Sequence, residues 1–225
     1  MTAERGRASR QRTALALAAL LALIAAWPGS TLAANVPPQF HDALVTTVAG
    51  KGPTALAWLP NGDVLIADQG GTLYRLPAGA VNAVVALDLT GGACTDGEEG
   101  LLGVAVDPDF TNHPFVYTYE TVKNGQQCVN RVSRWTVTGG TTIDASSQKL
   151  LIDNIPTPSA YHKGGDLEFG GDGDLYVSVG DGECDLADPN RCQDDNPNAR
   201  RLDVLLGKIL RIDRDGKPPA DNPFM

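Results

Sequence analysis

Helical periodicity is missing from this chain. After the first 33 residues, no segment shows a sustained 3.6-residue spacing of apolar side chains. That spacing is the main signature of amphipathic helices, so its absence excludes a helical bundle. Glycine and proline are instead frequent, at 25 and 15 of 225 residues. This composition predicts a turn-rich, all-β protein that is long enough to bury a real core.

Positive charge is also scarce. The chain has 18 Lys and Arg against 27 Asp and Glu, which gives a formal net charge of −9. Proteins that bind nucleic acids gather Lys and Arg against the phosphates. We therefore expect no nucleic-acid partner and a protein whose ligands are neutral or cationic.

The N-terminus has the pattern of a targeting segment. Four arginines within the first twelve residues precede the apolar run Ala14–Trp27, whose 14 residues are too few to span a bilayer comfortably. Pro28 and Gly29 end the run, and Thr31–Ala33 offers a small-residue cleavage site. We predict a signal peptide over residues 1–33 and a secreted or periplasmic chain with no membrane contact after cleavage. An uncleaved anchor is the alternative.

Export makes the cysteines interpretable. The chain has four, Cys94, Cys128, Cys184 and Cys192. An even number in an exported protein indicates disulfides, and four cysteines allow three pairings. We favour Cys184–Cys192, which closes a short acidic loop, together with Cys94–Cys128. Zinc is the alternative, but there is no Cys-x-x-Cys spacing and no histidine near the cysteines in sequence.

The loop over residues 181–195 is strongly acidic but lacks the EF-hand pattern, with no glycine at its sixth position and no glutamate at its twelfth. Its oxygen ligands would suit calcium, and a solvated acidic loop is the alternative. The metal ligands therefore stay unassigned. The carboxylates are Asp181, Glu183, Asp185, Asp188, Asp194 and Asp195.

The chain contains an irregular internal repeat. Thr54–Ala67 and Gly165–Ser178 both read as strand, Asn/Asp-Gly turn and strand, which is a strong hairpin signal. Gly103–Tyr119 has the same layout with a longer turn, and Lys208–Gly216 is a partial fourth copy. We take Trp58, Val106 and Phe169 as equivalent positions. Repeated antiparallel hairpins at such spacing predict a β-propeller, and a β-sandwich is the alternative.

The expected strands fall into three groups. We expect residues 43–48, 55–58, 64–68 and 72–76 in a first blade. Residues 81–89, 104–106, 116–120 and 130–138 would form a second. Residues 149–154, 165–169, 175–179 and 209–212 would follow.

Four stretches, in this order, resemble the glucose/sorbosone dehydrogenase family, soluble sugar dehydrogenases that use pyrroloquinoline quinone (PQQ). They are Glu99–Gly103 with Asp107–Phe110, Phe115–Tyr117, His162 through Asp181, and Leu206–Ile212 with Asp221–Phe224. The resemblance implies a six-bladed β-propeller, of which residues 34–225 hold the N-terminal part and about half of the blades. It also extends to hedgehog-interacting-protein propellers, which are binding proteins.

The resemblance assigns roles to two residues. His162 would be the general base that takes a hydroxyl proton from a sugar while a hydride leaves to the quinone. Glu98 and His162 would contact PQQ, and Gly164 and Gly165 would let the backbone approach the flat cofactor. The family has glutamine where Glu98 stands and aspartate where Tyr161 stands. A carboxylate at position 98 would repel the anionic quinone unless it were protonated or bridged by a metal.

The resemblance further implies that calcium assists PQQ, and that the calcium ligands and the cationic contacts to the quinone lie beyond Phe224. We therefore expect an incomplete cofactor site in these 225 residues, and open strand edges that invite pairing between chains. Glu98 and Glu99 are two carboxylates, as glycoside hydrolysis requires, but adjacent strand residues point to opposite faces and would not cooperate. Two classes remain: an exported PQQ-dependent aldose dehydrogenase, and a non-catalytic propeller that binds carbohydrate or protein.

Overall fold

The computed structural model describes residues 37–183 and 197–224. The chain divides into two compact units, residues 1–44 and 45–225. Every strand of the described residues lies in the second unit, and the only helix among them is the 3₁₀ turn η1 (Asn198–Arg200). None of the helices described is long and apolar enough to cross a membrane. The predicted all-β class is confirmed.

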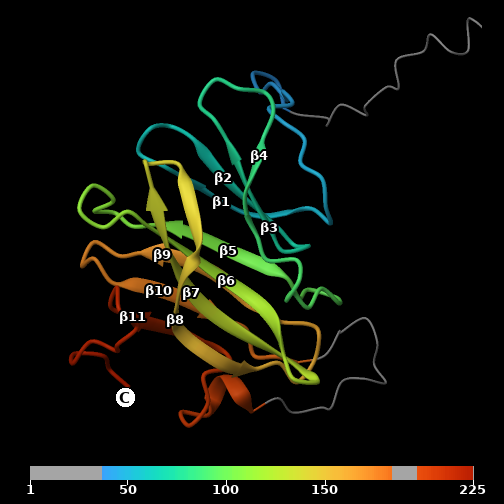
Figure 1. Ribbon diagram of the computed structural model, residues 1–225. Coiled ribbons are helices and arrows are strands. Elements are labelled where there is room, and N and C mark those ends of the chain that lie inside the picture. Colours follow the sequence, from blue (N-terminus) through green and yellow to red (C-terminus); the bar gives the residue numbers. More distant parts are fainter. Residues whose placement is uncertain (1–36, 184–196, 225) are drawn as a thin grey trace, which may run out of the picture. The chain divides into compact units, whose positions relative to one another are not determined.

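In the described residues, eleven strands form three antiparallel sheets in which the strands pair in chain order (Figure 1). The first two sheets have four strands each, and the third has three among the residues described. The strands are β1 (Pro53–Trp58), β2 (Val64–Asp68), β3 (Thr72–Leu76) and β4 (Val84–Asp88) in the first sheet, β5 (Leu101–Val106), β6 (Phe115–Asn124), β7 (Gln127–Thr138) and β8 (Thr142–Pro156) in the second, and β9 (Gly164–Phe169), β10 (Leu175–Val179) and β11 (Lys208–Ile212) in the third.

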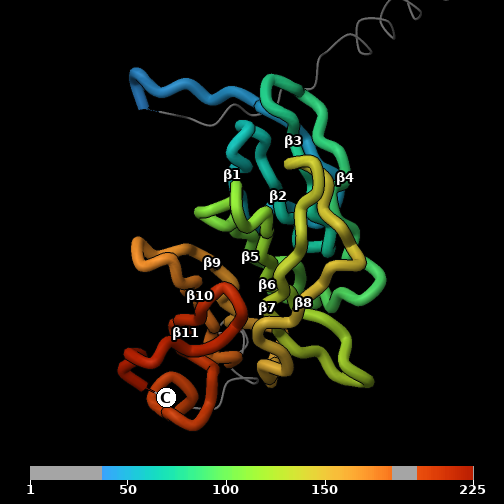
Figure 2. The backbone as a smooth tube through the Cα atoms, turned by 60° about the vertical axis from the view of Figure 1, so that its left-hand side comes forward, coloured from blue at the N-terminus to red at the C-terminus, as the bar shows by residue number. Residues whose placement is uncertain are grey.

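The second sheet is buried on both faces. Val116 of β6 belongs to a core shared with the first sheet, whereas Tyr117 and Tyr119 belong to a core shared with the third. This division follows from the alternation of side chains along a strand. Strand β5 also contacts both β1 and β9, so the first strands of the three sheets lie side by side (Figure 2). These are successive blades of a β-propeller, about half of a six-bladed one, as predicted.

Register confirms the internal repeat. Trp58 pairs with Val64, Val106 with Val116, and Phe169 with Leu175, so the three positions proposed as equivalent each end the first strand of a blade. The two short turns have the same hydrogen bonds. Leu59 N donates to Asp63 O at 2.9 Å, and Gly170 N donates to Asp174 O at 2.9 Å.

An arginine occupies the same place on the third strand of each sheet. In the first and third sheets it forms an ion pair with the aspartate that ends the hairpin turn, at 2.5 Å and 2.8 Å. In the second sheet Phe115 stands at the aspartate position, and the arginine lies over its ring, 4.0 Å from the centroid. The same arginine reaches Asp215 of the third blade at 3.1 Å. The arginines are Arg75, Arg134 and Arg211, and the two aspartates are Asp63 and Asp174.

The expected grouping of strands was wrong in three places. Residues 81–89 contain β4, the outer strand of the first sheet, and residues 149–154 lie within β8, the outer strand of the second. Residues 43–48 form no strand. The first and second sheets each obtain their fourth strand from the chain that directly follows their third, because short antiparallel connections are favoured. High β-propensity at residues 43–48 is not enough without a partner strand.

Strand β6 also carries a carboxyl group into the interior between the sheets. Glu120 is 3% exposed, its Oε1 accepts a hydrogen bond from the Ser133 hydroxyl at 2.6 Å, and its Oε2 has no partner among the described residues. Burial raises the pKa of Glu120 to about 7, although Ser133, Thr118 and the Arg131 guanidinium act in the opposite direction. Ionisation of Glu120 in the folded state is therefore unfavourable.

Glu120→Gln should make the protein more stable above neutral pH. The pKa of Glu120 rises from 4.5 to about 7 on folding, so the unfolded chain loses its proton first and stability falls as the pH rises between these values. At about 1.4 kcal/mol per pKa unit, the loss is on the order of 3 kcal/mol. Glutamine mimics the neutral acid, so the variant should exceed the wild type at pH 8 and match it near pH 4.5. Urea unfolding measures both, with exposed Glu168→Gln as control, and parallel pH profiles for variant and wild type would contradict the assignment.

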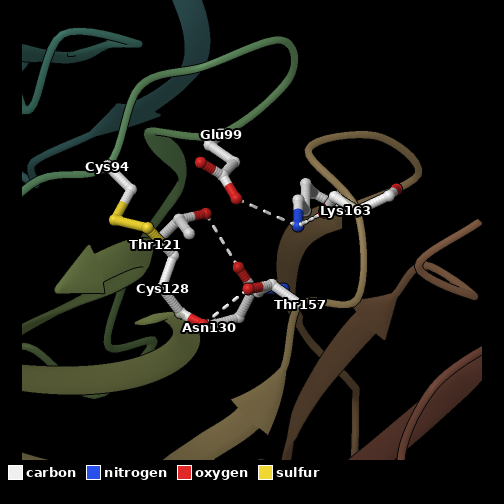
Figure 3. The surroundings of a disulfide bond; sticks show 8 residues. Cys94, Glu99, Thr121, Cys128, Asn130, Thr157 and Lys163 are labelled. Carbon is white, nitrogen blue, oxygen red and sulfur yellow. Dashed lines mark hydrogen bonds and ion pairs between the residues drawn. A yellow bond between two sulfur atoms is a disulfide. The ribbon is translucent and has the colours of Figure 1, made fainter. Parts of the chain in front are cut away.

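A disulfide ties the β4–β5 connection to the β6–β7 hairpin (Figure 3). Cys94 and Cys128 are bonded, as predicted, with their Cα atoms 6.2 Å apart. Cys94 N also donates to Thr121 O at 3.0 Å, and Ala93 bridges to Val122, so the connection runs briefly as an extra strand beside β6. The other predicted pair, Cys184–Cys192, lies outside the described residues.

Removing this disulfide should destabilise the fold without abolishing it. The bond closes a loop with a sequence separation of 34 residues. Chain-entropy arguments give about 3–4 kcal/mol for a loop of that length. We expect Cys94→Ala/Cys128→Ala to lower the free energy of unfolding by that amount, measured by urea unfolding against the oxidised wild type. Equal stability would mean that the backbone pairing alone holds the connection.

Candidate functional site

Four connections leave the same ends of the three sheets and meet there. They are the turn after β2 and the β4–β5, β8–β9 and β10–β11 connections, and main-chain hydrogen bonds join them in pairs. Glu98 N donates to Ala160 O at 2.9 Å, and Gly182 N donates to His162 O at 3.1 Å. The Gln69 side chain donates from the β2–β3 turn to the carbonyl oxygens of Gly97 and Glu99, at 2.7 and 3.0 Å.

His162 lies at the centre of this meeting point, on the β8–β9 connection. Its backbone has φ 54°, in the left-handed region that few residues other than glycine adopt. Its main-chain N–H donates to Glu98 Oε2 at 2.7 Å, and its ring Nδ1 lies 2.9 Å from Asp181 Oδ1. The His162 and Asp181 side chains are 32% and 30% exposed, so ligands in solution can reach both.

The contact between Asp181 and His162 defines what the ring can do. A carboxylate only accepts hydrogen bonds, so with a neutral ring it requires the proton on Nδ1. The lone pair then resides on Nε2, which has no hydrogen-bond partner among the described residues. An imidazole oriented in this way is a competent acceptor for a hydroxyl proton. The predicted base is thus paired with an orienting carboxylate, Asp181, which sequence reasoning placed in the acidic loop and at the end of the His162–Asp181 stretch but without a role beside His162.

The glycines of this region serve close backbone packing. A Cβ on Gly180 would lie 1.8 Å from His162 O, and one on Gly164 would lie 2.6 Å from Gly180 N. A Cβ on Gly165 would lie 2.7 Å from the Leu102 Cβ. Close packing of the chain is thus one reason for Gly164 and Gly165, and the expectation that they let the backbone approach a cofactor stays a prediction.

A buried ion pair lies next to His162. Lys163 is 1% exposed, and its ammonium lies 3.3 Å from Glu99 Oε1 and donates to Ser159 O (Figure 3). Burial lowers the pKa of Lys163, and the neighbouring Glu99 carboxylate only partly offsets this. Sequence reasoning did not select Lys163, because a lysine beside glycines in a loop has the pattern of an exposed residue.

Tyr161 and the remaining histidines have ordinary environments. Tyr161 is half-buried, its N–H donates to the Ser159 hydroxyl at 3.1 Å, and its ring packs on Gly97. His113 lies 3.8 Å from Asp109 with a side chain that is 41% exposed, and His41 is exposed. Neither histidine belongs to the site.

Three side chains lie close enough together to suggest a metal site, namely Cys94, Glu99 and Cys128. The two sulfurs are bonded to each other and Glu99 is paired with Lys163, so this group does not fit calcium, which requires oxygen ligands. No other group of this kind occurs in residues 37–183 and 197–224. Most of the acidic loop considered for calcium lies outside the described residues, and Asp181 at its start is engaged with His162.

An open groove of about 250 Å³ lies between β1, β5 and β9. It is lined by Trp58, Val106 and Phe169, which end their strands, together with Leu56 and Glu168. His162 precedes β9, so the groove lies at the opposite end of the strands and is separate from the His162 site.

Gly180→Ala should disrupt the site and the fold together. The new methyl group would collide with the main-chain oxygen of His162, which cannot rotate away as a side chain could. Overpacking of this kind costs about 1–3 kcal/mol. Gly171→Ala is the matched control, because a methyl group there would meet nothing within 4 Å and its φ is ordinary. We expect urea unfolding to show a loss only for Gly180→Ala, and equal stabilities would contradict the close packing.

Comparison with known proteins supports the resemblance. Residues 51–225 match the family model of glucose/sorbosone dehydrogenases. The chain is 31% identical over 188 residues to quinoprotein glucose dehydrogenase B of Acinetobacter calcoaceticus, covering 76% of this chain and 39% of that protein. It is 27% identical over 162 residues to the hedgehog-interacting protein of Mus musculus, covering 68% of this chain and 21% of that protein.

Solved structures give the same result. The PQQ-bound form of aldose sugar dehydrogenase from Streptomyces coelicolor is similar with a TM-score of 0.66 and 30% identity, covering 81% of this chain and 50% of that one. The chain thus spans about half the length, or less, of the relatives it matches. The matched residues include all three sheets and the His162 connection, and on this evidence the chain belongs to the glucose/sorbosone dehydrogenase family.

Proposed function

We propose that this chain is part of a PQQ-dependent aldose dehydrogenase in which His162 is the general base. The observation that carries the proposal is the contact between His162 Nδ1 and Asp181 Oδ1 at 2.9 Å. With the proton held on Nδ1, the lone pair is on Nε2 of a ring whose side chain is 32% exposed, and a sugar hydroxyl can donate its proton to it. Removal of that proton makes departure of a hydride from the same carbon favourable.

Each residue of the site has a distinct part in this reaction. Asp181 holds the ring and stabilises the imidazolium that forms when His162 takes the proton. Glu98 is exposed, and its Oε2 accepts the His162 N–H at 2.7 Å, so it holds the main chain at His162. PQQ supplies the hydride acceptor when it is bound. His162, with a side chain that is 32% exposed, fits the reacting end of PQQ as a base, whereas the exposed Glu98 carboxylate would fit an anionic quinone only if it were protonated or bridged by a metal.

The described residues around His162 offer little positive charge for the carboxylates of PQQ. Lys163 is the cation nearest to His162 in sequence, and its ammonium is engaged with Glu99. The described residues near His162 therefore act on the substrate hydroxyl, and we assign none of them to the carboxylates of PQQ or to calcium. We derive no step through calcium. Export to the periplasm or outside the cell, after removal of residues 1–33, is part of the same proposal.

A non-catalytic propeller is the second candidate. The observation that favours it is the Glu98 carboxylate beside the His162 loop, which disfavours an anionic cofactor. The similarity to hedgehog-interacting protein supports this candidate, because that relative is named for an interaction with another protein. With this function the exposed rim would bind a neutral carbohydrate or a protein.

The test is dye reduction by an aldose after the protein, at the length of its relatives, is reconstituted with PQQ and calcium. We expect activity in the wild type, a loss of about 10³-fold in kcat for His162→Gln, and a smaller loss for Asp181→Asn. His113→Gln is the matched control and should retain full activity. Full activity of His162→Gln would remove the general-base assignment, and an inactive wild type that still binds carbohydrate would favour the second candidate.

A further inference from the structure

Two adjacent carboxylates hold two adjacent residues of the β8–β9 connection. Glu98 accepts the main-chain N–H of His162 at 2.7 Å, and Glu99 pairs with the Lys163 ammonium at 3.3 Å. The two carboxylates point to opposite sides of their segment, so Glu98 is exposed and Glu99 is 6% exposed. The segment therefore holds one residue from the surface and the next from the interior. We name the four residues, Glu98, Glu99, His162 and Lys163, the clasp.

Stability alone does not explain the buried half of the clasp. Removing two charges from water costs several kcal/mol per ion, and replacing a buried pair by apolar side chains of similar volume is often neutral or stabilising. Lys163 nevertheless places its charge where it is 1% exposed and reaches both Glu99 and Ser159 O. A buried pair of this kind specifies one arrangement of the connection, since any other arrangement would leave a charge unpaired in the interior.

The backbone conformation of His162 needs surrounding contacts that determine it. Its left-handed backbone at φ 54° is intrinsically unfavourable and persists only where the surroundings determine it. Three contacts fix its direction, through the main-chain N–H to Glu98, the main-chain oxygen to Gly182 N, and the ring to Asp181. A peptide that turned over at this point would carry the ring away from Asp181.

We propose that the clasp positions His162, so that its ring donates from Nδ1 to Asp181 and keeps the lone pair on Nε2. Lys163 and Glu99 act as positioning residues through the main chain, and Glu98 acts through the His162 amide. The inference rests on the proposed role of His162 as a base for its functional meaning, but the geometry that it claims can be measured without any turnover.

The first experiment uses Glu98, whose exposure lets the variants fold. Nitrogen-15 NMR of the ring, at a pH at which the imidazole is neutral, reports which nitrogen carries the proton. We expect a single Nδ1–H tautomer for His162 in the wild type. Glu98→Gln keeps an acceptor and should retain that tautomer, whereas Glu98→Ala should give a mixture with the Nε2–H form. The resonances of His41 and His113 serve as internal controls, and an unchanged tautomer in Glu98→Ala would overturn the role of Glu98.

The second experiment addresses the buried pair. Lys163→Met leaves Glu99 buried and unpaired, so folding is checked by circular dichroism, and the double variant Lys163→Met/Glu99→Met removes both charges. We expect the double variant to fold as stably as the wild type and to lose the single His162 tautomer. Lys149→Met, which breaks an exposed pair with Asp215, is the matched control. A double variant that folds and keeps the Nδ1–H tautomer would show that the pair is structural only.

Turnover separates this inference from the proposed function. In an active protein, the double variant should lower kcat by about 10²-fold, because misplacement of a reacting group by about 1 Å costs that much, and KM should change little. If the wild type shows the single tautomer but never oxidises an aldose, the clasp stands and the dehydrogenase proposal fails. If the wild type oxidises aldoses and its His162 ring is a mixture of tautomers, the clasp fails and the proposed function stands.

Discussion

The contact between two stretches of main chain, His162–Gly164 and Gly180–Gly182, is the constraint on which the site depends. Gly180 can lie against His162 only because it lacks a Cβ, and Gly182 N then donates to His162 O at 3.1 Å. Asp181 is carried between these two glycines and reaches the imidazole. The pairing of β9 with β10 brings the two stretches together, since Gly164 pairs with Val179. The strand register of the third sheet therefore determines the geometry of the His162–Asp181 pair. A shift in that register would separate the two side chains.

The parts of the fold that the sequence predicted are those set by local chemistry. The turns at Asn61–Asp63 and Asp172–Asp174 fixed the hairpins, and the alignment of Trp58, Val106 and Phe169 is correct in register. The grouping of strands into blades failed at β4 and β8, because local patterns show that a strand forms but not which edge it joins. Asp181 and Lys163 acquire their roles from partners 19 and 64 residues away, and no local pattern encodes such contacts.

The interior of this propeller accommodates buried carboxyl groups in two different ways. Glu99 and Lys163 are buried as a pair, and each is the other's partner. Glu120 is buried with hydroxyl groups near it and one oxygen without a partner among the described residues, so it favours the neutral state instead. The difference lies in the segments involved. Glu120 belongs to a regular strand between two cores, whereas Glu99 and Lys163 lie on the connections that directly precede β5 and β9.

The difference between strands and connections explains how one propeller fold can serve either catalysis or binding. The arginine–aspartate pairs within the first and third sheets and the apolar cores between sheets stabilise the fold regardless of what the connections carry, so the connections are free to change. A surface that only binds needs its connections to present side chains, and it can tolerate several backbone arrangements. General-base chemistry needs one direction of the imidazole ring. Here three contacts hold His162, and a buried ion pair holds the next residue, Lys163. The contacts around His162 therefore support the proposed catalytic role, because a general base depends on the direction of its ring.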